Sequence, residues 1–207
     1  HAAGSGSSNK TLELLQILQS SEIRLEFWTH IDSFGNWTAG GTNIMFLRAY
    51  SYSEAGAPTP RIALYARGTA DQGTYSYRAY CGPSASQITV DLKSAASGYN
   101  DAYVVNNNAP GWYKHVVSWK ASSTDVAADG DFTWFVYAAA DIEHAVAGGL
   151  AHTSATGAVP LASIGREIIT GLSTVPAVYY GDLTVHDAFA GEGGPGILLP
   201  MLHDPRA

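Results

Sequence analysis

The stretch Gly111-Trp112-Tyr113-Lys114-His115-Val116-Val117-Ser118-Trp119-Lys120, followed after a polar turn by Asp131-Phe132-Thr133-Trp134-Phe135-Val136-Tyr137, decides the fold class. Both segments alternate as half-buried β-strands do, because successive side chains of a strand point to opposite faces of a sheet. Together they predict a β-hairpin. The side chains that we expect to share a buried face are His115, Val117 and Trp119 in the first strand, and Phe132, Trp134 and Val136 in the second.

Further segments extend this pattern to an all-β chain. The other expected strands are residues 24–31, 43–50, 61–67, 74–81 and 87–92. Residues 11–19 fit either a short helix or an apolar strand, and the polar residues 93–110 predict a loop. The two faces of segment 24–31 carry Leu25, Phe27, Thr29 and Ile31 on one side, and Arg24, Glu26, Trp28 and His30 on the other.

Length and composition are consistent with one sandwich domain. The chain has 207 residues, of which 46% are hydrophobic and 14% charged, with 22 glycines and 12 tyrosines. A chain of this length can bury a complete core, and many glycines with few charges are typical of short strands joined by turns. We expect a domain over residues 11–190, an N-terminal arm over 1–10, and a C-terminal arm over 191–207 in which a Gly/Pro linker leads to apolar residues.

The order of motifs after residue 111 resembles the C-terminal half of laminin-G-like, concanavalin A-like jelly-roll domains. The matching motifs are Trp112, His115-Val116, Ser163-Ile164-Gly165 and Gly181-Asp182-Leu183-Thr184-Val185-His186-Asp187. The resemblance covers residues 22–190 and implies a two-sheet antiparallel jelly-roll sandwich. The closing strand lacks the acidic and basic pair usual in that family, so the resemblance implies a fold and not a shared ligand.

Charge, hydropathy and cysteine content limit the classes of partner and the kind of thiol that we expect. The formal net charge is -7, which argues against nucleic acid, because affinity for a phosphate backbone comes from lysine and arginine. No apolar run is long enough to span a membrane. The one cysteine, Cys81, forms no internal disulfide; we expect a buried thiol on the same face as Tyr75 and Tyr77 rather than a reactive one.

The carboxylate pattern argues against an enzyme. Glycosidases of the concanavalin-like class place two carboxylates on one strand, and no such motif occurs here. Asp141 and Glu143 come nearest, but they follow an apolar strand and predict a solvated turn. The strand motifs of polysaccharide lyases with this fold are also absent. We therefore expect a chain without enzyme activity that requires no cofactor; the alternative is a glycoside hydrolase or a polysaccharide lyase.

Metal binding is predicted weakly, and only for calcium. The histidines lack the i, i+2 or i, i+4 spacing of a metal site, and His115 and His186 are most simply strand residues. Calcium prefers carboxylate and carbonyl oxygens in loops. The candidate ligands are Asp125, Asp129 and Asp131, although a turn closed by aspartate hydrogen bonds explains the same residues.

Saccharide binding is expected in the loops at the rim of the sandwich. Sugar faces stack on aromatic rings while hydroxyl groups take hydrogen bonds from polar neighbours. A ring packed into the core would explain each of these aromatic residues as well. The candidate residues are Asn36, Trp37, Tyr99, Asn100, Tyr103 and Asn106.

Both arms indicate an assembly. Small side chains make few contacts to offset the conformational entropy that is lost when a segment becomes ordered. We therefore expect neighbouring subunits to hold the arms in a homo-oligomer or larger particle. The apolar run Ile197-Leu198-Leu199-Pro200-Met201-Leu202 would dock on a neighbour or pack on its own sandwich. We expect a non-catalytic lectin-like component on a virion or cell exterior that binds surface glycan. The alternative is a carbohydrate-binding module of a larger secreted enzyme or adhesin.

Overall fold

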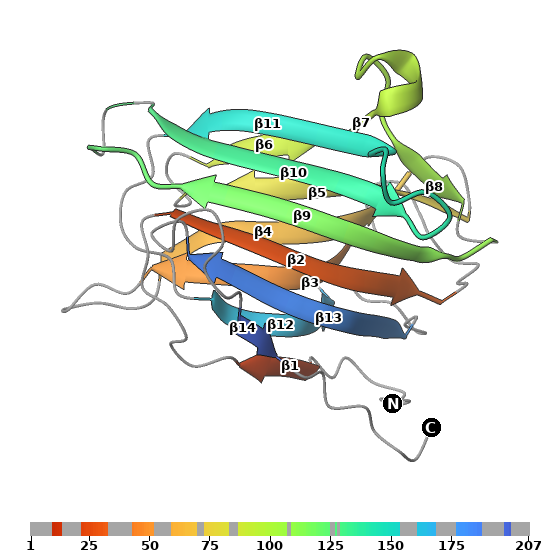
Figure 1. Ribbon diagram of the computed structural model, residues 1–207, viewed down its shortest axis with the longest axis horizontal. Coiled ribbons are helices and arrows are strands. Elements are labelled where there is room, and N and C mark those ends of the chain that lie inside the picture. Colours follow the sequence, from red (N-terminus) through yellow and green to blue (C-terminus); the bar gives the residue numbers. More distant parts are fainter. Residues whose placement is uncertain are drawn as a thin grey trace.

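The computed structural model is a sandwich of two antiparallel β-sheets (Figure 1). It describes residues 10–13, 22–32, 43–51, 59–69, 73–82, 87–106, 109–124, 127, 129–153, 161–168, 177–187 and 197–199. The predicted fold class, an all-β two-sheet jelly-roll sandwich, is confirmed. The outer parts of both predicted arms lie outside the described residues.

One sheet, here called sheet A, has the strand order β1-β12-β3-β4-β5-β6, with β8 also pairing with β5. Its strands are β1 (Lys10–Glu13), β3 (Asn43–Ser51), β4 (Thr59–Gly68), β5 (Thr74–Cys81), β6 (Ile88–Asp91), β8 (Val104–Asn106) and β12 (Leu161–Ile168).

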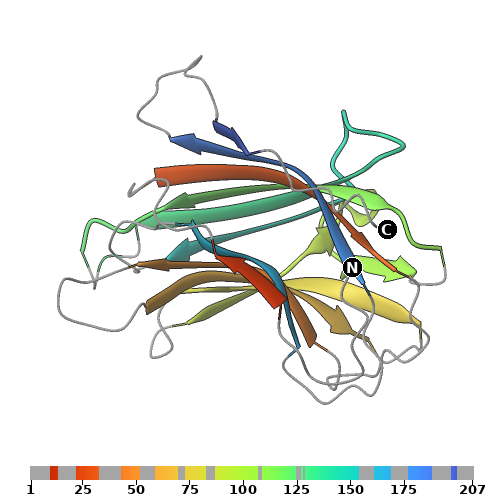
Figure 2. The same cartoon turned by 90° about the horizontal axis from the view of Figure 1, so that it is seen from below.

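The other sheet, sheet B, has the order β14-β13-β2-β9-β10-β11-β7 and faces the viewer in Figure 1. Its strands are β2 (Glu22–Ile31), β7 (Lys93–Ser94), β9 (Trp112–Lys120), β10 (Gly130–Ala138), β11 (Ala147–Thr153), β13 (Val178–Asp187) and β14 (Ile197–Leu199). Figure 2 shows the two sheets as separate layers.

The core lies between the two sheets and is aromatic. The predicted hairpin is confirmed: β9 pairs with β10, and the inward residues of both strands are buried. The alternation predicted for residues 24–31 is also confirmed, since Leu25, Phe27, Thr29 and Ile31 are all buried. The largest side chains of this core are Trp119, Trp134, Tyr77, Phe27, Phe46 and Phe132.

His115 is a core residue whose two ring nitrogens are both bonded. The indole N–H of Trp134 donates to His115 Nδ1 at 3.1 Å. The neutral ring therefore carries its proton on Nε2, which donates to Thr29 Oγ1 at 2.8 Å. Burial lowers the pKa of His115 to about 3. The ring stays uncharged at neutral pH and acts structurally, as the sequence predicts.

Cys81 lies in the same core. It is buried on the face of β5 that also carries Tyr75 and Tyr77, so the predicted structural thiol is confirmed. Burial raises the pKa of this thiol well above its usual range, which disfavours the reactive thiolate.

Two segments differ from the simplest sequence expectation. The predicted loop 93–110 contains the short strands β7 and β8 and a 3-10 helix over Ala95–Ser97. Residues 11–13, the described part of the ambiguous segment 11–19, belong to strand β1, which pairs with β12. In the C-terminal segment, β14 pairs with β13 of the same chain. Among the described residues, no helix is long and apolar enough to cross a membrane.

Candidate functional site

The outer face of sheet B carries a group of aromatic side chains at one end. Strand register places Tyr179 of β13 opposite His30 of β2, and His30 opposite Trp112 of β9. One step further along the strands, Gly181 lies opposite Trp28. Because facing residues of antiparallel strands point to the same side, these residues share the surface opposite the core.

The His30 ring is in contact with two of the others. The ring centroids of His30 and Trp112 lie 5.4 Å apart, and those of His30 and Tyr179 lie 5.9 Å apart. A Cβ added to Gly181 would lie 3.4 Å from Trp28 Cβ and 3.7 Å from Trp112 Cζ3. These are ordinary contact distances, so Gly181 lies against both tryptophans and a methyl group would fit in its place. We call Trp28, His30, Trp112 and Tyr179 the aromatic platform.

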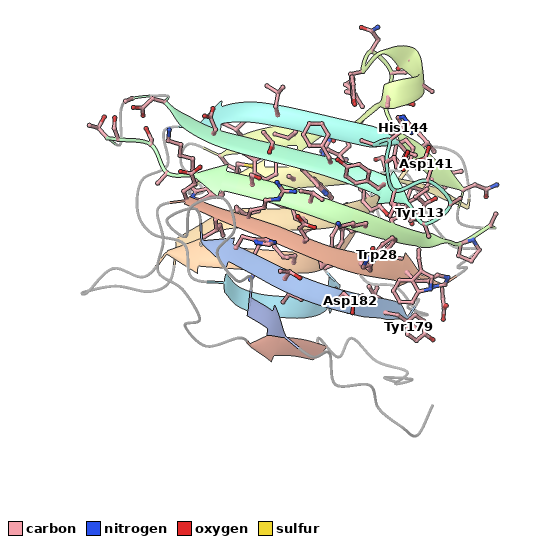
Figure 3. All side chains as sticks on the ribbon, viewed as in Figure 1. Trp28, Tyr113, Asp141, His144, Tyr179 and Asp182 are labelled. Carbon is pink, nitrogen blue, oxygen red and sulfur yellow. The ribbon has the colours of Figure 1, made fainter. Side chains whose placement is uncertain are left out.

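The platform is open to solvent. Trp112 is 41% exposed and Tyr179 is 45% exposed, whereas the tryptophans of the same sheet that face the core, Trp119 and Trp134, are 1% and 0% exposed. Large exposed rings grouped on one surface are typical of binding sites. Figure 3 shows Trp28 and Tyr179 on β2 and β13 toward the same end of the sheet.

Carboxylates border the platform. The Tyr179 hydroxyl donates to Asp32 Oδ2 at 3.2 Å, and the negative charge of Asp32 raises the pKa of Tyr179. His30 Nδ1 lies 3.6 Å from Asp32 Oδ1, is buried, and has no hydrogen-bond partner. Asp182 is exposed in the irregular part of β13 and has a φ of 40°, a backbone conformation that is uncommon outside glycine.

A charged cluster adjoins the platform at Glu26 on β2. Lys114 Nζ lies 2.7 Å from Glu26 Oε2, Arg24 Nη2 lies 2.8 Å from Glu26 Oε1, and His186 Nε2 lies 3.9 Å from the same oxygen. Burial alone would raise the pKa of Glu26, but Lys114 and Arg24 together lower it. The carboxylate is therefore ionised at neutral pH, and three donors surround it.

This arrangement suits a sugar chain better than it suits a metal ion. The rings offer flat apolar faces, and the neighbouring carboxylates, imidazole and ammonium group offer hydrogen-bond donors and acceptors. Among the described residues, no three histidine, cysteine, aspartate or glutamate side chains are placed to hold a metal ion together.

Of the saccharide candidates from the sequence, Tyr99 lies on this face of the molecule. Its ring lies over Gly148 of β11, where a Cβ on the glycine would come 3.1 Å from Tyr99 Cε1. Asn100 is exposed beside it and donates to the Ser97 carbonyl at 2.8 Å.

Two other saccharide candidates, Tyr103 and Asn106, lie elsewhere. The Tyr103 ring stacks on Tyr77 with a centroid distance of 6.4 Å, and burial raises its pKa. Asn106 is exposed on β8 of sheet A. Asn36 and Trp37 lie outside the described residues.

Of the calcium candidates, Asp129 is bonded within its own turn. Asp129 Oδ1 accepts from Ser122 Oγ at 2.6 Å and from the Ser123 N–H at 2.9 Å, and these bonds hold its pKa well below the usual range. This is the closed turn that the sequence left open as the alternative. Asp131 is exposed on β10, and Asp125 lies outside the described residues. Calcium binding stays a prediction.

Asp141 forms the predicted solvated turn. It is exposed, and its Oδ1 accepts from the N–H groups of Glu143 at 3.0 Å and His144 at 3.2 Å. These bonds and the His144 ring close the turn beyond β10, and Figure 3 shows Asp141 and His144 at the upper end of the same view.

The platform residues were absent from the sequence-based site candidates, although a signal for them existed. Alternation assigns Trp28 and His30 to the outer face of their strand. The same rule places Trp112 on the outer face of β9, because His115, three residues later, points inward. Sequence reasoning looked for binding residues in loops, whereas these side chains lie on the outer face of a sheet.

Comparison with known proteins shows the fold alone. No family model and no curated protein matches the chain. The alginate lyase from Klebsiella pneumoniae has a similar structure, with a TM-score of 0.50 and 10% sequence identity over 80% of this chain and 60% of that chain. The chain thus spans less than two thirds of that lyase. The CBM2 module of the evolved Dit of Lactobacillus casei BL23 phage J-1 aligns with a TM-score of 0.33 and 6% identity over 78% and 69% of the two chains.

The lyase comparison corrects one prediction and limits another. The expectation that the chain is not an enzyme is wrong, because it depended on missing strand motifs, and a polysaccharide lyase has this sandwich at only 10% identity. At such low sequence identity, the absence of a motif does not exclude enzyme activity. The resemblance to laminin-G-like domains holds for the β-sandwich, and no family model supports it more closely.

Proposed function

We propose that the chain binds a polysaccharide on the outer face of sheet B, with the aromatic platform as its main contact. The observation that carries the proposal is the grouping of four rings from three strands, two of them more than two fifths exposed. Sugar rings present C–H faces that stack on such surfaces, and their hydroxyl groups reach the carboxylates of Asp32 and Asp182 at its border.

The class of polysaccharide is determined by testing the binding of one neutral and one acidic polymer. Lys114 and Arg24 carry positive charges near the rings, but both pair with Glu26, and the carboxylates of Asp32 and Asp182 also border the platform, so the local charge does not select an acidic chain over a neutral one. An extracellular or virion-surface location agrees with this function, because polysaccharide ligands are displayed there.

Affinity electrophoresis in gels containing alginate or a soluble cellulose derivative tests the proposal. Trp112→Ala removes the ring that touches both His30 and the space over Gly181, so we expect retardation to fall about tenfold, as for an aromatic residue at the centre of an interface. The matched control is Tyr80→Ala, which removes a ring from the outer face of sheet A. Equal retardation of Trp112→Ala and wild type by every binding polymer would contradict the proposal.

A second candidate function is polysaccharide lyase activity at the same platform. The specific observation is that His30 and Tyr179, two side chains able to exchange protons, adjoin each other and Asp32. In β-elimination a base removes the proton from the carbon bearing the sugar carboxylate, the bond from the next carbon to the glycosidic oxygen breaks, a carbon–carbon double bond forms, and an acid protonates the departing oxygen.

Ultraviolet absorbance of the new conjugated double bond tests this candidate with alginate as the substrate. Tyr179→Phe keeps the stacking surface and removes the hydroxyl, so we expect retained binding and lost product formation. His30→Ala should also abolish the product. Product formation by both variants at the wild-type rate would show that His30 and Tyr179 do not carry the reaction, and absence of product with wild type would reject lyase activity on alginate. Neither outcome affects the binding proposal.

A further inference from the structure

A groove of about 740 Å³ lies at the edge of sheet B, where β11 lies beside β6 of sheet A. Two aromatic rings, Tyr99 and Phe135, line it together with the exposed Leu150. Its volume is in the range of ligand sites. This groove is separate from the aromatic platform, which lies on β2, β9 and β13.

The two rings that line the groove pack against a glycine, Gly148 of β11. Gly148 lies opposite Phe135 in the β10–β11 register. A Cβ at this position would come within 2.8 Å of the Phe135 ring and within 3.1 Å of the Tyr99 ring. Both rings thus rest on the bare backbone of β11, and any side chain at Gly148 would displace them.

The backbone that carries Tyr99 is held rigidly in an uncommon conformation. Tyr99 has a φ of 64°, in the left-handed region that side chains other than glycine rarely adopt. Its N–H donates to the Ser94 carbonyl at 2.9 Å, and Ser97 Oγ accepts from the Asp101 N–H at 2.9 Å. Such strain persists only where surrounding contacts enforce it, and it is concentrated at ligand sites.

The groove and the platform belong to one continuous face. Phe135 lies opposite Val116, which is four residues along β9 from Trp112. At about 3.4 Å per residue and about 4.8 Å between strands, the two aromatic groups are roughly 15 Å apart at their nearest residues. One sugar ring cannot reach both groups, whereas a chain of several sugars can. The other non-glycine residue with positive φ among the described residues, Asp182, borders the platform.

We propose that the groove is a second saccharide subsite, in which Tyr99 and Phe135 bind the distal sugars of a chain whose other end lies on the aromatic platform. This inference rests on the proposed function. Continuity of the exposed face identifies the occupant as the same polysaccharide. The exposed Thr89 and the side chains of Lys93 and Asp91 at the groove supply polar partners for hydroxyl groups, with Asp91 held by Arg78 at 2.6 and 2.7 Å.

Chain-length dependence of affinity tests the second subsite. Titration calorimetry with a dimer and a hexamer of alginate, and with cellobiose and cellohexaose, measures the affinity of each probe. We expect Tyr99→Ala to weaken hexamer binding about tenfold and to leave dimer binding unchanged. Trp112→Ala should weaken both. Gly148→Ala, which disturbs the rings without removing them, should match Tyr99→Ala.

The outcomes separate this inference from the proposed function. The matched control is Val104→Ala, an exposed residue 46% accessible on sheet A, and it should bind like wild type. Tight hexamer binding that Tyr99→Ala leaves unchanged would overturn the subsite alone. Absence of binding for both hexamers would contradict the subsite and the platform together. A Tyr99→Ala variant that changes sedimentation and not affinity would identify the groove as a contact between copies, and would also overturn the subsite.

Discussion

The two faces of sheet B carry one histidine each on neighbouring strands, and these histidines lie in opposite surroundings. His115 faces the core, where both ring nitrogens are bonded and burial keeps the ring neutral. His30 faces outward among exposed rings, and its Nδ1 has no hydrogen-bond partner. One histidine is thus fixed by hydrogen bonds inside the core, and the other lies on the face that we propose binds a ligand.

The largest expected effect is a difference in the free energy of unfolding between variants of the buried face and of the outer face of sheet B. Trp134→Ala removes a fully buried ring and the donor to His115, so we expect the free energy of unfolding to fall by about 3–5 kcal/mol. Leu150→Ala, on the adjacent strand but 68% exposed, should change it by no more than about 0.5 kcal/mol. Chemical denaturation measures both. Similar losses in the two variants would remove the distinction between the faces.

The next effect is a pH dependence that comes from the buried face. Because the pKa of His115 is lowered to about 3 in the folded state, protons bind the unfolded chain more readily, and stability is lost as pH falls below the ordinary histidine value of about 6.5. From pH 7 to pH 5 we expect a loss of about 2 kcal/mol, at up to about 1.4 kcal/mol per pH unit.

Denaturation curves of wild type and His115→Phe across that pH range check this prediction. The variant loses the bonds to Thr29 and Trp134, so it should be less stable at every pH, but its stability should depend less on pH by the same 2 kcal/mol, approximately. Carboxylates protonate mainly below this range. Parallel curves for the two proteins would show that another group carries the acid sensitivity.

The smallest effect concerns the charged cluster of the outer face. Glu26→Gln should lower stability by about 0.5 kcal/mol at low salt and by less at high salt, because the ion pairs with Arg24 and Lys114 lie near the surface and are screened. Thermal unfolding at two salt concentrations measures the difference. A salt-independent loss would indicate that hydrogen bonding rather than charge dominates at Glu26.

The buried face was predictable from the sequence because it depends on one rule. Strict alternation identifies the inward residues of β2, β9 and β10 without knowledge of their neighbours. It also predicts correctly that His115 is a strand residue and that Cys81 is buried.

The outer-face site was not predictable, because it depends on which strands are neighbours. Tyr179 and His30 are far apart in sequence and meet only through the pairing of β13 with β2. The approach of Gly181 to Trp28 and Trp112 depends on the same pairing. Local patterns carry no information on such long-range register. Tyr99 was found from its loop position, but its ring is placed by Gly148, about fifty residues later in the chain.

Amide hydrogen exchange with and without a bound polysaccharide tests the central claim most directly. We predict added protection at the platform ends of β2, β9 and β13, around residues 28–31, 112–114 and 179–182, and none on the outer face of sheet A. Protection confined to residues 34–38, with exchange at the platform unchanged, would contradict the account and favour the saccharide candidates Asn36 and Trp37 that the sequence predicts.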